Sequence, residues 1–69
     1  MSRTKTRNEI ATELLDGCPQ ESLADHTVLA ERLRWSEHPD TILASPEANR
    51  WPETYTWLKN ELAAERRIG

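Results

Sequence analysis

Residues 19–36 read PQESLADHTVLAERLRWS and carry the longest helical pattern in the chain. Pro19 suits the first turn of a helix, where a backbone N–H is not needed. At 100° per residue, the apolar side chains that follow form a broad strip and a narrower strip on the opposite side. The broad strip holds Leu23, His26, Leu29, Ala30 and Leu33, and the narrow strip holds Ala24, Val28 and Trp35. Because helices with two apolar sides are usually central, we expect neighbours on both sides of this one.

The preceding segment predicts a shorter helix over residues 7–16. Thr6 followed by Glu9 fits a capping box, in which a hydroxyl and a carboxylate each bond a free backbone N–H. Gly17 can adopt the left-handed conformation that ends a helix. Since the connection to the next helix is short, these two helices should be antiparallel neighbours.

Three prolines divide the segment that follows the central helix. A residue before proline is disfavoured in helical conformation, so His38, Ser45 and Trp51 are expected boundaries. Between them, residues 40–44 and 45–49 each fit a short helical turn, the second of them capped by Ser45.

The last helix is expected over residues 52–67, with two apolar stripes. One stripe holds Trp51, Tyr55, Leu58 and Leu62, and the other holds Trp57, Ala64 and Ile68. A single stripe is enough to close a three-helix core, so the second is available for a partner.

The expected fold is therefore all-α: a compact three-helix domain with one or two short helical turns between the second and last long helices. Residues 1–6 are expected to form a flexible basic arm, and residues 7–69 a single helical domain. Leu, Ile and Val together number only 12 of 69 residues. Because a core of this size yields about 3–5 kcal/mol of stability, association with itself or with a partner is expected.

Charge and composition exclude several classes of protein. The net charge is −3, and residues 19–49 alone carry −4, which favours a protein partner over a polyanion. Cys18 is the only cysteine, so no intramolecular disulfide can form. No apolar run has the length of a signal sequence core or a membrane span, so we expect a cytoplasmic chain without membrane association.

No residue pattern predicts catalysis, a cofactor or a metal. Cys18 has no basic neighbour in sequence and is expected to be an inert, small apolar residue. His26 is expected to pack with its ring bonded to a backbone carbonyl. His38 lies near Glu37 and Asp40, but the pairs lack the helical spacing of zinc ligands. We therefore expect no enzyme activity.

The aromatic residues Trp35, Trp51, Tyr55 and Trp57 lie within 23 residues of a chain that has no Phe. They could all belong to the core and its rim, or Trp57 and Trp35 could be exposed on a binding face, since Trp is a favoured interface anchor. The second interpretation predicts a small non-enzymatic protein-binding module: an adaptor, inhibitor or regulatory subunit. Its partner-binding residues would be Trp35, Trp57, Glu61, Ala64, Glu65 and Ile68.

The alternative function is a dimeric DNA-binding transcriptional regulator. Its phosphate contacts would come from the basic arm and the basic end of the last helix, at Arg3, Lys5, Arg7, Arg66 and Arg67. A helix-turn-helix drawn through residues 9–25 would, however, direct the carboxylates of Glu21 and Asp25 toward phosphates. A third possibility is a homodimer or larger homo-oligomer in which the second stripes pair with each other.

Overall fold

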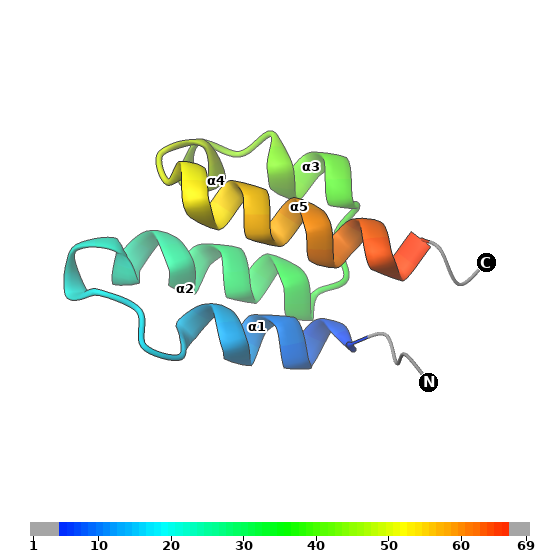
Figure 1. The fold of residues 1–69 in the computed structure, drawn as a ribbon, viewed down its shortest axis with the longest axis horizontal. Helices are drawn as coiled ribbons and strands as arrows, with labels where there is room; N and C mark the ends of the chain where they lie inside the picture. Colours follow the sequence, from blue (N-terminus) through cyan, green and yellow to red (C-terminus); the bar gives the residue numbers. More distant parts are fainter. Residues whose placement is uncertain (1–4, 67–69) are drawn as a thin grey trace.

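A computed structural model describes residues 5–66, with the backbone alone at residues 65 and 66. Within this range every regular element is a helix, which confirms the all-α prediction. In chain order these are α1 (Arg7–Leu15), α2 (Gln20–Arg34), α3 (Pro39–Leu43), α4 (Pro46–Asn49) and α5 (Pro52–Arg66) (Figure 1). The three-helix description holds only roughly, because α1 has nine residues whereas α2 and α5 have fifteen each.

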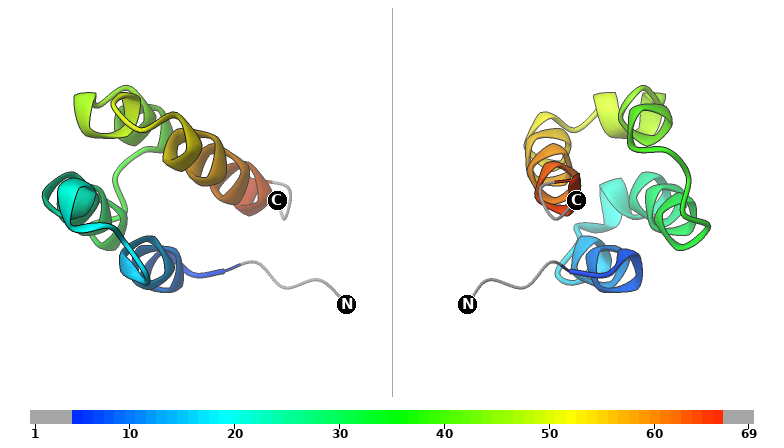
Figure 2. Two further views of the ribbon diagram at one scale, coloured as in Figure 1. Left: turned by 60° about the vertical axis from the view of Figure 1, so that its left-hand side comes forward. Right: turned by 90° about the vertical axis from the view of Figure 1, so that its right-hand side faces the viewer.

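The helices form two layers (Figures 1 and 2). In one layer, α1 and α2 lie side by side and antiparallel, as their short connection predicts. In the other layer, α3 and α4 pack against α5, and both also contact α2. The central position expected for α2 is therefore confirmed, since it contacts α1, α3 and α4.

The two ends of α1 follow local sequence signals. At its start, the Glu9 backbone N–H donates to Thr6 Oγ1 at 3.1 Å and the Thr6 N–H donates to Glu9 Oε1 at 2.9 Å, so the capping box is confirmed. At its end, Asp16 is extended (φ −71°, ψ 122°) and Gly17 has φ 69°. The Cys18 N–H donates to the Leu15 carbonyl at 3.3 Å, which makes this a type II turn with glycine at the position that requires positive φ.

The C-terminal end of α2 is a Schellman motif built without glycine. The Ser36 N–H donates to the Leu33 carbonyl at 3.0 Å, and the Glu37 N–H donates to the Arg32 carbonyl at 3.2 Å. Ser36 has φ 58°, in the left-handed region. A side chain with a Cβ atom costs about 1–2 kcal/mol in this conformation. The backbone that follows Trp35 is therefore held in a strained turn.

The proline boundaries are confirmed, and Ser45 is the N-cap residue of α4, but the capping bond expected from its side chain is wrong. Its hydroxyl donates backward to the Ile42 carbonyl at 2.6 Å and makes no capping bond to α4. It therefore stabilises the end of α3 instead. The start of α3 is capped by His38, whose Nδ1 accepts from the Asp40 N–H at 3.1 Å.

The core lies between the two layers and includes most of the apolar positions that the helical periodicity indicates. Its buried members are Ile10, Ala11, Leu14, Leu29, Ala30, Leu33, Ile42, Ala48, Leu58 and Leu62. Leu23, at the start of the broad strip of α2, is exposed instead, as are Ala24 and Trp35 of the narrow strip. Over residues 5–66, no helix is both long and apolar enough to cross a membrane.

Candidate functional site

The most exposed aromatic side chain is Trp35, which follows the last residue of α2. Its exposed fraction is 80%. Among the described residues, Leu23 is the other exposed large apolar side chain, with an exposed fraction of 44%. The two residues lie at opposite ends of α2, about 18 Å apart at 1.5 Å per residue, so they do not form one patch. Trp35 therefore stands alone as an indole offered to solvent.

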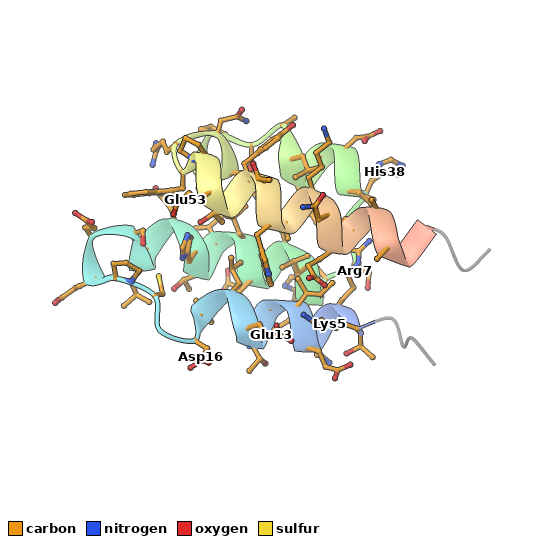
Figure 3. All side chains as sticks on the ribbon, in the orientation of Figure 1. Lys5, Arg7, Glu13, Asp16, His38 and Glu53 are labelled. Carbon is orange, nitrogen blue, oxygen red and sulfur yellow. The ribbon has the colours of Figure 1, made fainter. Side chains whose placement is uncertain are left out.

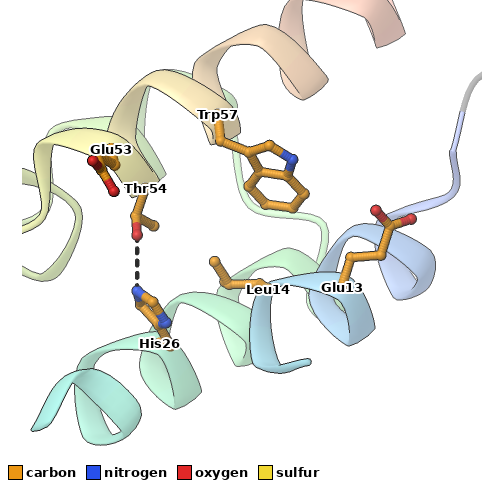
Figure 4. A pocket seen from close by; sticks show the side chains of 6 residues that line it. All are labelled: Glu13, Leu14, His26, Glu53, Thr54 and Trp57. Carbon is orange, nitrogen blue, oxygen red and sulfur yellow. Dashed lines mark hydrogen bonds between the residues drawn. The ribbon is translucent and has the colours of Figure 1, made fainter. Parts of the chain in front are cut away.

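Trp57 is only half-buried, and it packs against the core. It lines a recess of about 200 Å³ between α1, α2 and α5 (Figure 4). The other residues in the wall of this recess are Glu13, Leu14, His26, Glu53 and Thr54. Trp57 is thus partly core and partly the wall of an open cavity, in contrast to Trp35.

Lys5 joins α1 to α5 beside Trp57. Its Nζ atom donates to Glu13 Oε1 at 2.8 Å, and the two side chains lie next to each other in Figure 3. The same atom donates to Glu61 Oε2 at 3.4 Å and lies 5.9 Å from the centroid of the Trp57 ring. The hydrogen bond that Lys5 donates to Glu13, and more weakly the one that it donates to Glu61, raises the pKa of Lys5. The ammonium group therefore occupies part of the surface that Trp57 could present to a partner.

The predicted partner-binding residues thus fall into different environments. Trp35 is exposed, Trp57 and Ala64 are half-buried, and Glu61 is paired with Lys5. The side chain of Glu65 and the whole of Ile68 lie outside the described residues. Trp35 follows α2 and Trp57 lies on α5, so the two rings come from different layers of the fold.

The basic residues of the alternative function have internal partners where they are described. Lys5 binds two glutamates, and Arg7 Nη1 donates to the Glu37 carbonyl at 2.9 Å. This second bond ties α1 to the turn that follows Trp35. Arg3, Arg67 and the side chain of Arg66 lie outside the described residues.

The structure brings His26 together with Cys18 and Thr54. His26 is only 6% exposed; its Nδ1 lies 2.7 Å from Cys18 Sγ, and its Nε2 lies 3.0 Å from Thr54 Oγ1. The expectation that its ring bonds a backbone carbonyl is therefore wrong. Burial lowers the pKa of His26, and the charge of the neighbouring Asp25 opposes this shift.

Sequence spacing contains a partial signal for this cluster. Cys18, Ser22 and His26 are four residues apart in succession, the spacing that places side chains on one side of a helix. Cys18 Sγ also lies 3.4 Å from Ser22 Oγ. Eight residues of helix rise about 12 Å, so this spacing indicates a shared side but not the contact between Sγ and Nδ1, and nothing local indicates Thr54.

A second polar cluster joins α2 to the start of α5. Asp25 accepts hydrogen bonds from Arg50 Nη1 at 2.8 and 3.0 Å and from Trp51 Nε1 at 2.8 Å. The bond from Trp51, followed by the one from Arg50 and its charge, lowers the pKa of Asp25. The Trp51 ring also meets the His26 ring edge-on, at 6.4 Å between centroids and 70° between planes. This cluster has a structural role, because it positions α5 on α2.

Across residues 5–66, no group of three or more His, Cys, Asp and Glu side chains is placed to hold a metal ion. Comparisons with protein-family models, with curated proteins and with solved structures find no match to the chain.

Proposed function

We propose that the chain is a small non-enzymatic protein-binding module in which Trp35 is the principal anchor. The observation that carries this proposal is the 80% exposure of its side chain in a chain with few large apolar residues. A Trp side chain buries about 150–250 Å² when it is covered, and truncating such an anchor typically costs 2 kcal/mol or more of binding energy. An apolar pocket on a partner protein is the natural complement.

The backbone around Trp35 is fixed before any partner arrives, which supports this role. The Schellman motif holds Ser36 and Glu37, and Arg7 from α1 bonds the Glu37 carbonyl. A docking residue on a rigid backbone loses less conformational entropy on binding. Backbone strain such as that at Ser36 is also frequent at functional positions.

Trp57 has a secondary role in this proposal. Its ring is half-buried, and the Lys5 ammonium lies over it. It supports the core and contributes an edge to the recess, instead of acting as the main anchor. The adaptor, inhibitor or regulatory-subunit role and the cytoplasmic location belong to this proposal as well.

The test is a pair of truncations at exposed apolar sites. Trp35→Ala should leave the circular dichroism spectrum and thermal midpoint unchanged, because the indole makes little contact with the core. Leu23→Ala is the matched control, since it removes an exposed apolar side chain at the other end of the same helix. We expect cross-linking in a lysate of the source cells to capture a partner with the wild-type chain and with Leu23→Ala, but not with Trp35→Ala.

Two results would contradict the proposal. One is capture of the same partner at equal yield by Trp35→Ala. The other is a salt-sensitive complex with DNA that Trp35→Ala leaves intact, because phosphate contacts weaken steeply with salt whereas an indole in an apolar pocket does not. Sedimentation equilibrium of both variants shows whether the partner is a second copy of the chain.

A further inference from the structure

Cys18 and His26 form a thiol–imidazole pair that the proposed binding surface does not use. Their Sγ and Nδ1 atoms are 2.7 Å apart, so the two groups are in direct contact. The other polar neighbours of the sulfur, the Pro19 carbonyl and Ser22 Oγ, lie farther away at 3.4 Å. The imidazole is therefore the nearest acceptor for the thiol proton.

The imidazole of His26 is held in place by contacts with two residues near the start of α5. It is 6% exposed, its Nε2 lies 3.0 Å from Thr54 Oγ1, and the edge of Trp51 packs against it. A neutral imidazole carries one N–H. When that proton is on Nε2 and is donated to Thr54, the Nδ1 lone pair faces the sulfur. Thr54 on α5 is thus a positioning residue for a base on α2.

We propose that Cys18 is a nucleophilic thiol that reacts with hydroperoxides, with His26 as its general base. A nucleophile within hydrogen-bond reach of a base, itself oriented by a third group, is the arrangement that activates side-chain nucleophiles. The pair differs in this respect from an isolated cysteine, for which no proton acceptor would be fixed in advance.

The reaction balances without any group beyond the peroxide. Sulfur attacks one peroxide oxygen, so an S–O bond forms while the O–O bond breaks. The thiol proton passes to His26 Nδ1 and then to the departing oxygen, which leaves as water from hydrogen peroxide or as an alcohol from an organic hydroperoxide. Sulfur is oxidised to sulfenic acid and the peroxide is reduced. Since the chain has no second cysteine, an external thiol is needed to convert the product to a mixed disulfide.

Both partners of the reaction can be reached. Cys18 is partly exposed at the turn between α1 and α2, so a small peroxide can approach the sulfur. His26 also lines the recess of about 200 Å³, which gives the base access to solvent for proton exchange (Figure 4). The carboxylate that acts on its charge is that of Asp25 on its own helix, and Glu13 from α1 and Glu53 from α5 also line the recess. Burial nevertheless lowers the pKa of His26, which favours the neutral, proton-accepting ring near pH 7.

The experiment measures the rate of sulfenic acid formation with hydrogen peroxide, trapped by dimedone and followed by intact-mass spectrometry. The wild-type chain is compared with itself unfolded in urea and with His26→Asn, which can still bond the sulfur but cannot accept its proton. Because general-base catalysis contributes about 10²–10⁴-fold in favourable cases, we expect the folded wild type to react at least about tenfold faster at pH 7 than either reference. Cys18→Ser should give no adduct.

The pH dependence of this rate shows whether His26 assists the reaction or whether Cys18 reacts only because it is exposed. The rate in the folded chain should rise as His26 loses its proton, below the usual value of about 6.5, and then level off. In the unfolded chain the rate should continue to rise toward about pH 8.5, where a free thiol ionises. If the folded chain reacts no faster than the unfolded one, or if both profiles coincide, the proposal is wrong. Should His26→Asn fail to fold, as judged by circular dichroism, the wild-type rates and profiles decide the question by themselves.

Discussion

Replacing Ser36 with glycine should stabilise the protein, although it removes atoms and adds no contact. Ser36 has φ 58°, and this left-handed conformation costs a residue with a Cβ atom about 1–2 kcal/mol. Glycine avoids that cost but gives the unfolded chain more freedom, worth about 0.5–1 kcal/mol in the opposite direction. The net expectation for Ser36→Gly is a gain of about 0.5–1 kcal/mol in the free energy of unfolding.

The gain is measurable because the whole domain is small. At about 0.05–0.15 kcal/mol per residue, a chain of this length has roughly 3–10 kcal/mol of stability in total. For a domain of this size, each kcal/mol moves the thermal midpoint by about 4–8 °C. Thermal and urea denaturation of Ser36→Gly, followed by circular dichroism, should therefore show a midpoint higher by roughly 2–8 °C.

Gly17 provides a matched control, for which the expected change in the free energy of unfolding has the opposite sign. It has φ 69°, and a Cβ atom at this position would meet no other atom within 4 Å. Gly17→Ala therefore introduces backbone strain without a clash, and we expect a loss of about 1 kcal/mol. If Gly17→Ala behaves in this way while Ser36→Gly is neutral or destabilising, the argument from strain at the end of α2 is refuted.

Three further predictions concern the buried Leu58, the Asp25 carboxylate and the half-buried Trp57. Leu58 is 0% exposed, so Leu58→Ala should lower the free energy of unfolding by about 2–5 kcal/mol in urea denaturation, and a loss below 1 kcal/mol would argue against its central position. The pKa of Asp25 is lower in the folded chain than its usual 3.8. The stability that its carboxylate contributes is therefore fully present above pH 3.8 and is lost as the pH falls through the pKa of the folded chain. Urea midpoints measured between pH 2 and 6 should therefore fall less steeply with acid in Asp25→Asn than in the wild type; equal slopes would show that Asp25 does not contribute. Trp57→Ala should cost about 1–3 kcal/mol because its ring packs partly on the core, whereas Trp35→Ala should stay within about 0.5 kcal/mol, and the reverse order in thermal denaturation would exchange the roles of the two rings.

The sequence predicts most of the helix ends because these depend on neighbouring residues. The Thr6–Glu9 capping box, the positive φ of Gly17 and the boundaries before the prolines involve side chains within a few positions of the backbone they affect. Ser36 is the exception. A serine in a left-handed turn has no sequence signal, and its conformation accompanies the two backbone hydrogen bonds to the Leu33 and Arg32 carbonyls.

The candidate site was less predictable because it depends on how helices meet. Periodicity finds two apolar stripes on the last helix but does not show how far each one is buried. In the structure Leu58 and Leu62 are buried, while Tyr55 from the same stripe and Trp57 from the other are both half-buried. The bonds of Thr54 to His26 and of Trp51 to Asp25 cross 28 and 26 positions of sequence. No local pattern indicates contacts of this kind.

The two-layer arrangement implies an order of folding. A turn of a few residues joins α1 to α2, so this hairpin can form early at a small entropic cost, whereas α5 must return across more than twenty residues to reach Asp25 and His26. Substitutions between α1 and α2 should therefore slow folding, and Thr54→Val should mainly accelerate unfolding in stopped-flow experiments. The last helix, α5, is then expected to join the hairpin last and to separate from it first. Its backbone amides should therefore exchange hydrogen with solvent before those of the hairpin do.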